Sequence, residues 1–437
     1  MTVEEVDISA REEKPVALTG QHEGQTTNIA QRVLTRENAV LVGLVFVLVL
    51  AAYFRFTGLD WDGNHHLHPD ERFLTEIASR LQPVDDPLAY LRTSESTLNP
   101  YNIDKSFYVY GNFPMTVIVY ASNWLQQLCR ATVDLCSYNY AGYDGVHLVG
   151  RFFSGFVDLI SVLFIFLIGR RLYGWRAGLL GALLLGIAVM PIQQSHFFTM
   201  DNWAAALCTV ALYGAVRASE DARHKRWWLL FGLFLGLAVS SRINVAPLAA
   251  IAPIAGVIWL ARREQQAAPG LGWRYINTER GNVDLQRVIL GVLLAAVMSL
   301  TTFRLAQPYA FMDAEMVRQT VQAETGRQPS SIRVAMQSIV GFNPNWISNM
   351  QEIQAQQSPE AAHPPALQWT ARAPILFPLS NMVLYGMGLS AGIAAVVGFL
   401  WALWRTLRAH PQWIAHAIPV AWAGAYFLFM GTRWVKS

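Results

Sequence analysis

The apolar stretch Asn38–Tyr53, NAVLVGLVFVLVLAAY, decides the fold of this chain. It carries no charged residue and approaches the roughly 20 apolar residues that an α-helix needs to cross a membrane. Comparable stretches recur through all 437 residues, of which 53% are hydrophobic and only 14% charged. Soluble domains carry about 25% charged residues. The composition therefore predicts an all-α polytopic membrane protein.

Basic residues at the ends of the apolar stretches predict the orientation. Arg32 and Arg36 precede the first stretch, and basic segments separate later ones. Because cytoplasmic loops are enriched in Lys and Arg, we expect a multi-pass plasma-membrane protein with a cytoplasmic N-terminus. Residues 1–37 are polar and are predicted to form a disordered cytoplasmic tail. The net charge of +3 gives no reason to expect a nucleic-acid partner.

Residues 38–437 are predicted to form one transmembrane domain of about nine spans. The expected spans are Asn38–Tyr53, Phe152–Ile168, Ala177–Met190, Asp201 to Val216, Trp227–Val239, Ile243–Leu260, Val288–Phe303, Leu376–Leu403 and Trp413–Met430. Two long exoplasmic loops, residues 57–150 and 304–373, lie between them, and the first is expected to carry short interfacial helices.

The three cysteines are too few for a disulfide framework. Cys129 and Cys136 fall in the first loop and could pair with each other. If both lie on one helix, however, their spacing separates them by roughly 10 Å along its axis, which is too far for a bridge. The sequence leaves both alternatives open.

Candidate chemistry centres on the polar segment His65–Arg72, HHLHPDER, just beyond the first span. Asp70 and Glu71 follow Pro69, and acids in the first turn of a helix are stabilised by the helix dipole. The functional alternative is that one of them acts as a general base on a hydroxyl group that attacks a sugar. A departing phosphate needs no general acid, so one carboxylate would suffice, unlike the pair of most glycoside hydrolases.

Further candidates lie at the outer ends of the spans. Asp201 follows His196 and precedes an apolar stretch, where it could cap a helix or take part in chemistry. Arginines at the outer ends of spans are unexpected, because Lys and Arg are enriched on the cytoplasmic side. Their planar guanidinium groups could hold a lipid phosphate, or the side chains could simply extend to the membrane interface. These are Arg151, Arg242, Arg304 and Arg372, with Arg433 as a further candidate. His65, His66 and His68 could bind zinc or manganese with Asp70, although their spacing matches no recognised metal motif.

Taken in order, these motifs resemble the GT-C class of membrane glycosyltransferases, in its protein O-mannosyltransferase-like, phospholipid-carrier-dependent branch. The resemblance runs from about Ala51 to Ile251. It is carried by Asp70–Glu71, Gly150–Arg151–Phe152–Phe153–Ser154, Gly169–Arg170–Arg171–Leu172–Tyr173–Gly174, Ala177–Gly178–Leu179–Leu180, the segment Ser195 to Asp201, and Gly232–Leu233–Phe234–Leu235–Gly236–Leu237–Ala238 leading to Arg242.

The resemblance implies an inverting enzyme that moves mannose, or another hexose or pentose, from a polyprenyl-phosphate carrier to a hydroxyl of a protein, lipid or glycan at the outer membrane face. Asp70 or Glu71 would be the base, and Asp201 would support the acceptor or a metal. Arg151 and Arg242 would contact the carrier phosphate. Further substrate-binding candidates are His68, His196 and Arg372. No cofactor is required, although a divalent metal could bind.

Two departures from the family pattern stand out. Arg242 occupies a position where many relatives have lysine. The chain stops at Arg433–Ser437, where relatives continue into further spans, which suggests a C-terminally truncated product. Two alternatives stay open: a lipid or solute transporter or flippase without chemistry, and an inactive subunit of a larger glycosylation complex. Ionisable groups gather at the outer boundary rather than at mid-membrane, which favours an enzyme over a transporter.

Overall fold

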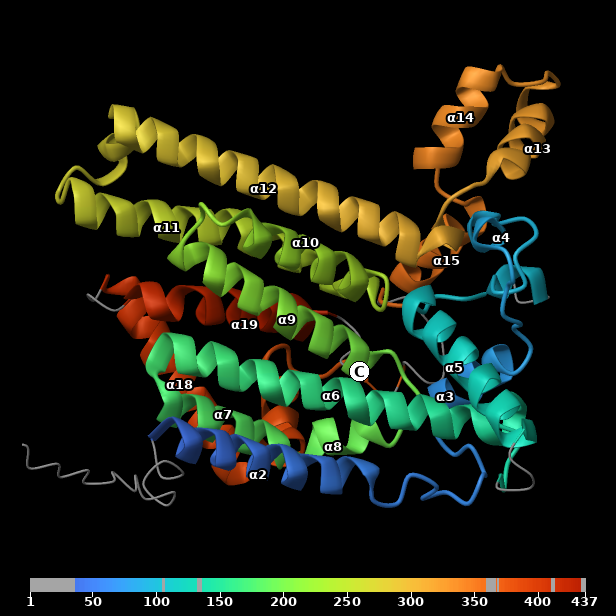
Figure 1. Cartoon of the computed structure of the whole chain (residues 1–437), viewed down its shortest axis with the longest axis horizontal. Helices are drawn as coiled ribbons and strands as arrows, with labels where there is room; N and C mark the ends of the chain where they lie inside the picture. Colours follow the sequence, from blue (N-terminus) through green and yellow to red (C-terminus); the bar gives the residue numbers. More distant parts are fainter. Residues whose placement is uncertain are drawn as a thin grey trace, which may run out of the picture. The chain divides into compact units, whose positions relative to one another are not determined.

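The computed structural model describes residues 36–103, 107–131, 136–358, 367, 369–409 and 413–433. This part of the chain is helical, and its only strand-like pairing is one bridge between Phe311 and Phe342 (Figure 1). The predicted all-α membrane fold is thereby confirmed. The predicted tail lies outside the described residues, except that Arg36 and Glu37 begin helix α2 (Arg36–Phe56). The chain divides into two compact units, residues 1–42 and 43–437.

The second unit holds two kinds of helix. Short helices fill the two loop regions: α3 (Pro69–Ala78), α4 (Pro87–Leu91), η1 (Pro100–Ile103), α5 (Asn112–Ala131), η4 (Pro308–Ala310), α13 (Ala314–Thr325), α14 (Ser331–Val340) and α15 (Pro344–Ala355). The other helices are α6 (Tyr143–Tyr173), α7 (Trp175–Gly186), α8 (Val189–Ser195), α9 (Asp201–Glu220), α10 (Lys225–Val239), η2 (Ile243–Ala250), α11 (Ile251–Ala267), η3 (Gly272–Asn277), α12 (Glu279–Ala306), α17 (Leu376–Asn381), η5 (Met382–Gly386), α18 (Leu389–Leu407) and α19 (Trp413–Gly431).

Six helical segments of the described residues are long and apolar enough to cross a membrane: α2, α6, η2 with α11, α12, α18 and α19. The pair α7 and α8, bent by 56°, could supply a seventh. Helices α9 and α10 form where spans were expected, but α10 has only 15 residues, fewer than the roughly 20 that cross a bilayer. Length and apolar character thus support fewer spans than the predicted nine.

One predicted span is not continuous, and one helix begins before its predicted span. The expected span Leu376–Leu403 is broken, because α17 runs into a π-helical turn and Gly388 then takes a positive φ of 80° before α18 begins. The first exoplasmic loop was expected to reach residue 150, but α6 begins at Tyr143. The first two turns of α6 are polar, and a hydropathy pattern cannot show that they continue an apolar helix.

Glycines allow the membrane helices to approach closely. A Cβ atom on Gly232 of α10 would lie 2.3 Å from the Ala295 carbonyl oxygen of α12, and one on Gly236 would lie 2.6 Å from the Ser299 oxygen. Lipid tails are as apolar as the helices, so close van der Waals packing replaces the hydrophobic effect as the main driving force. The GLFLGLA motif therefore joins α10 to α12, and both lie side by side in Figure 1.

A buried ion pair connects α2 to α6. Arg55 donates to the Asp158 carboxylate at 2.7 Å and to the Gly186 carbonyl oxygen at 2.8 Å, and both charged side chains are nearly fully buried. Gly186 ends α7, so the guanidinium satisfies a carbonyl that no helical N–H reaches. The pair therefore supports the bend between α7 and α8.

The first loop folds into its own apolar core against α6. Its buried members include Leu74 and Ile77 of α3, Met115 and Ile118 of α5, and Val146 of α6. Apolar residues at helical spacing on α3 and α5 face one another and cover the polar start of α6. This core gives the His65–Arg72 segment a fixed support beside the membrane helices.

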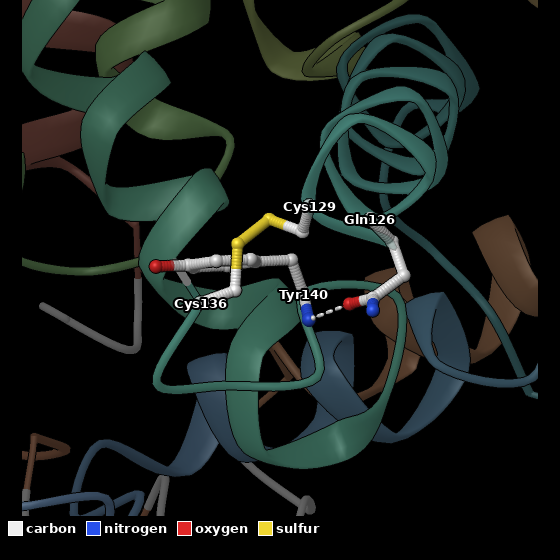
Figure 2. Close-up of a disulfide and its surroundings, with 4 residues drawn as sticks. All are labelled: Gln126, Cys129, Cys136 and Tyr140. Atoms are coloured by element: carbon white, nitrogen blue, oxygen red, sulfur yellow. Dashed lines mark hydrogen bonds between the residues drawn. A yellow bond between two sulfur atoms is a disulfide. The ribbon is translucent and has the colours of Figure 1, made fainter. Parts of the chain in front are cut away.

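A disulfide closes the far end of this loop. Cys129 lies near the end of α5, and Cys136 lies beyond that helix, so the two can and do pair (Figure 2). Close to the disulfide, the backbone N–H of Tyr140 donates to the Gln126 side-chain oxygen at 2.7 Å (Figure 2). Together these bonds hold the segment before α6 against α5.

We expect Cys129→Ser to lower the free energy of unfolding by about 2–3 kcal/mol, the loop-closure value for a cross-link this short. Thermal unfolding in detergent under non-reducing conditions measures the effect. The native protein treated with a reductant should melt like the variant, and the variant should not respond to reductant. A native melting temperature that stays the same after the disulfide is reduced would contradict this prediction.

Candidate active site

The adjacent acids Asp70 and Glu71 point to different environments. They occupy the first turn of α3, where Pro69 is the first helical residue and the His68 side chain accepts the Glu71 N–H. Successive residues of a helix are rotated by about 100°. Glu71 is therefore fully buried, whereas Asp70 stays partly exposed. The two carboxylates cannot share one role.

Glu71 is held in a buried ion pair. Its two carboxylate oxygens accept hydrogen bonds from Arg151 at 2.8 and 2.6 Å, and one of them also accepts the backbone N–H of Phe198 at 2.8 Å. Gly150 makes room for this arrangement, because a Cβ atom there would lie 2.3 Å from the Phe198 ring. With both oxygens hydrogen-bonded and no exposure, Glu71 is less accessible to an acceptor hydroxyl than Asp70, and the choice of base between the two acids stays a prediction.

Arg151 uses every one of its donors inside the protein. Besides the two bonds to Glu71, it donates to both Asp62 oxygens at 3.1 and 2.9 Å and to the Leu59 carbonyl at 2.7 Å. A guanidinium has five N–H groups, so none is left for a ligand. In this arrangement Arg151 ties α6 to the first loop, and its contact with the carrier phosphate stays a prediction.

Asp70 faces a second, more open cluster with Tyr110, Asp201 and Arg242. Arg242 donates to the Asp201 carboxylate at 2.7 Å, and its guanidinium lies 5.4 Å from the centre of the Tyr110 ring. Burial raises the pKa of the Tyr110 hydroxyl, and the negative charge of Asp70 and a hydrogen bond to its carboxylate raise it further. Asp201, Arg242 and Asp70 therefore meet around one tyrosine.

Gly111 brings Tyr110 to this place. Its N–H donates to the Ser241 carbonyl at 3.1 Å, and a Cβ atom on it would lie only 2.0 Å from the Ser240 carbonyl oxygen. No other residue type could let the loop approach the Ser240–Ser241–Arg242 break so closely. The next residue, Asn112, donates its N–H to the Gln307 side chain at 2.6 Å, which anchors the start of α5 as well.

A cleft adjoins the cluster. It is small and open to solvent, and the 210 Å³ of empty space within its outline includes that solvent. It lies where the first loop, the break after α10, the end of α12 and α15 meet. The lining residues are Val109, Tyr110, Gly111, Val239, Ile243, Phe303, Gln307, Trp346 and Met350.

The other candidate residues lie elsewhere. His68 caps α3, and its ring lies 4.2 Å from that of Phe197. His196 has its two ring nitrogens on the carbonyl oxygens of Ile192 and Thr57, at 2.8 and 2.9 Å. Arg372 is exposed and lies 5.3 Å from the Phe377 ring. We therefore assign packing and capping contacts to both histidines rather than substrate contacts.

The expected metal set of His65, His68 and Asp70 is not the one that the structure assembles. His65 has its Nδ1 on the carbonyl oxygen of Asp62 in its own turn, and His68 caps a helix. Among the described residues, one group of acids and imidazoles has its ligand atoms within 4.8 Å of one another: Asp60, Asp62 and His147. Sequence reasoning missed Tyr110 and these three residues, because Asp60 and Asp62 lie close together in the sequence but His147 and Tyr110 lie far from them.

Comparison with known proteins agrees with the class that this fold and site suggest. Residues 144–269 match the model of a family described as dolichyl-phosphate-mannose-protein mannosyltransferase, which confirms the resemblance to GT-C membrane glycosyltransferases. The match includes Arg151, Asp201 and Arg242 but begins after Asp70 and Glu71, and it covers less than half of the chain. No curated protein matches the chain.

Several solved structures match at low identity. The oligosaccharyltransferase of Archaeoglobus fulgidus in its apo form is 16% identical, with a TM-score of 0.47 over 92% of this chain and 48% of its own. The same protein with an inhibitory peptide and a dolichol-phosphate is 15% identical, at 0.48 over 91% and 48%. The S. cerevisiae protein O-mannosyltransferase complex bound to the sugar donor is 13% identical, at 0.47 over 70% and 39%. The chain spans half their length or less.

Proposed function

We propose that this protein is a membrane glycosyltransferase that moves a sugar from a polyprenyl-phosphate carrier to a hydroxyl acceptor. The observation that carries the proposal is the position of Asp70, which is partly exposed and faces Tyr110 and the Arg242–Asp201 pair beside the cleft. A carboxylate that can take a proton and a cation that can hold a phosphate are what an acid–base step on a lipid-borne phosphate requires. The family match over residues 144–269 supports the same class.

Asp70 acts as the general base in this proposal. Its carboxylate takes the proton of the acceptor hydroxyl while that oxygen attacks the anomeric carbon of the sugar. The bond from the anomeric carbon to the phosphate oxygen breaks, and the carrier phosphate leaves with the electron pair as a stable anion. Because one displacement replaces one bond from the opposite face, the product has inverted configuration.

Arg242 holds the carrier phosphate. Its guanidinium donates one hydrogen bond to the Asp201 carboxylate, and its Nε has no hydrogen-bond partner among the described residues. Unlike Arg151, it therefore keeps donors for a phosphate oxygen. Asp201 fixes the guanidinium over Tyr110, which orients the remaining N–H groups.

We further propose that the two loop regions face the exoplasmic side of the plasma membrane. The Cys129–Cys136 disulfide supports this orientation, because disulfides persist in oxidising compartments and are rare in the cytosol. This orientation agrees with a cytoplasmic N-terminus, which the basic residues before the first span predict. The sugar is mannose or another hexose or pentose, and the acceptor is a protein, lipid or glycan hydroxyl.

Purified full-length protein in liposomes, supplied with a polyprenyl-phosphate mannose donor and a serine- and threonine-rich peptide, tests the function. We expect mannosylated peptide, seen by mass spectrometry. Donors with other sugars, and lipid or glycan acceptors, extend the assay if this pair gives no product. Movement of the lipid-linked sugar across the bilayer without a glycosylated product from any of these pairs would instead favour a flippase, a class in which bent helices such as α7–α8 are common.

A further inference from the structure

We propose that Asp60, Asp62 and His147 bind one divalent transition-metal ion, of the zinc or manganese class, at the base of the first loop. Their ligand atoms lie within 4.8 Å of one another. Asp60 and Asp62 come from the segment just after α2, and His147 comes from the start of α6. Carboxylate oxygens and an imidazole nitrogen form a donor set that suits these ions.

His147 is the observation that points to a ligand. It is fully buried, and neither of its ring nitrogens has a hydrogen-bond partner among the described residues. The neighbouring His66 is also buried, with both ring nitrogens unpartnered, and its ring centre lies 4.4 Å from that of His147. Buried polar groups without a partner are rare and costly. A metal ion would satisfy the His147 nitrogen that faces the carboxylates.

The charge of the cluster also favours a cation. Arg151 carries one positive charge and is buried between Glu71 and Asp62, which carry two negative charges. Asp60 adds a further negative charge at the edge. The nearby Arg72 bonds the His66 carbonyl oxygen but is exposed to solvent. Buried charges that are not compensated are strongly unfavourable, so a divalent ion would balance the excess of carboxylates.

The acids have room to coordinate. One Asp62 oxygen accepts a single bond, from Arg151, and so keeps a lone pair. The Asp60 side chain is exposed and accepts hydrogen bonds from the Tyr138 hydroxyl at 2.8 Å and the Asn64 N–H at 3.1 Å. Ligand atoms of a tetrahedral zinc site lie about 3.4 Å apart, given metal–ligand bonds near 2.1 Å. A rotation of the exposed Asp60 side chain would bring its carboxylate within bonding distance of the same ion, and water molecules would complete the coordination.

The bound ion would fasten the first loop to α6. His147 lies one helical turn before Arg151 on α6. The ion would therefore bind the loop to α6 through Asp60 and Asp62, and the Arg151–Glu71 ion pair binds it a turn later. The ion would thus secure the support of α3 without touching Asp70, and the proposal does not depend on the proposed transfer reaction.

Metal analysis of the purified full-length protein tests this site. The protein is stripped with EDTA, dialysed against Zn²⁺ or Mn²⁺, with Mg²⁺ and Ca²⁺ in parallel, and then measured by elemental mass spectrometry and thermal unfolding. We expect one zinc or manganese ion per chain and a higher melting temperature when it is bound. Asp60→Asn and His147→Phe should each weaken binding at least tenfold, as loss of a ligand does.

Asp144→Asn is the matched control, because Asp144 is an exposed acid on the same helix, three residues before His147, and is outside the set. It should retain the full metal content. Asp60 is exposed, so its variant remains informative if His147→Phe fails to fold. Substoichiometric metal in the native protein, equal metal content in Asp60→Asn, or binding of Mg²⁺ and Ca²⁺ in place of Zn²⁺ and Mn²⁺ would overturn the proposal.

Discussion

Replacing Asp70 with asparagine is expected to lower the rate of sugar transfer by about 10²- to 10⁴-fold, which is the usual contribution of a general base. Asparagine has nearly the same shape but cannot take a proton from the acceptor. Because Asp70 is partly exposed and its neighbour Glu71 holds the buried ion pair, the fold should persist. The initial rate at saturating donor and the affinity for the donor, measured separately, check the prediction. The affinity should change little.

Asp85→Asn provides the matched control. Asp85 is an exposed acid of the same loop region, and its replacement should leave the rate unchanged. An Asp70→Asn protein that transfers sugar at the native rate would remove Asp70 from the mechanism. A parallel loss of rate in both variants would mean that the negative charge of the loop, rather than one carboxylate, matters.

Replacing Arg151 with methionine is expected to reduce the free energy of unfolding by about 3–5 kcal/mol, the cost of breaking a buried ion pair from one side. The substitution leaves the carboxylates of Glu71 and Asp62 buried, without their partner and close to each other. Denaturant unfolding in detergent, followed by tryptophan fluorescence, measures the change. We also expect a lower yield of folded protein in the membrane.

Arg130→Met serves as the control, because Arg130 is exposed on α5 and surface substitutions usually change stability by no more than about 0.5 kcal/mol. The comparison also tests the assignment of Arg151 to structure rather than to the substrate. An Arg151→Met protein that unfolds like the native protein yet binds the lipid-linked donor weakly would restore the phosphate role to this residue.

The contrast between Asp70 and Glu71 shows how far sequence patterns reach. The positions of both acids after Pro69 predict a helix start, and that start is confirmed at α3. Periodicity cannot tell which acid faces inward, because that depends on where α6 and the Phe198 segment pack. Arg151 illustrates the same limit. Its place at the outer end of an apolar stretch suggested a phosphate contact, whereas its partners, Asp62 and Glu71, lie 89 and 80 residues away in the sequence.

The helices follow the same division. The apolar stretches of the sequence predicted the positions of α2, α6, α11, α12 and α19, because the length and composition needed to cross a bilayer are local properties. The break between η5 and α18 escaped detection, since the residues around Gly388 are as apolar as those of a continuous helix. The early start of α6 has a different reason: its first turns are polar and are stabilised by the loop core rather than by lipid.

By itself the sequence determined that this is a helical membrane protein with acids and arginines at the ends of its helices, because hydropathy and the charge of short segments are written in consecutive residues. Only the tertiary structure decided which of those charges neutralise one another and which stay open to a ligand. Arg151 uses its N–H groups for hydrogen bonds inside the protein, whereas the Nε of Arg242 has no partner among the described residues. His147 lies close to Asp60 and Asp62. The physical reason is that charge compensation acts through space, between side chains whose distance is set by packing and not by their separation along the chain.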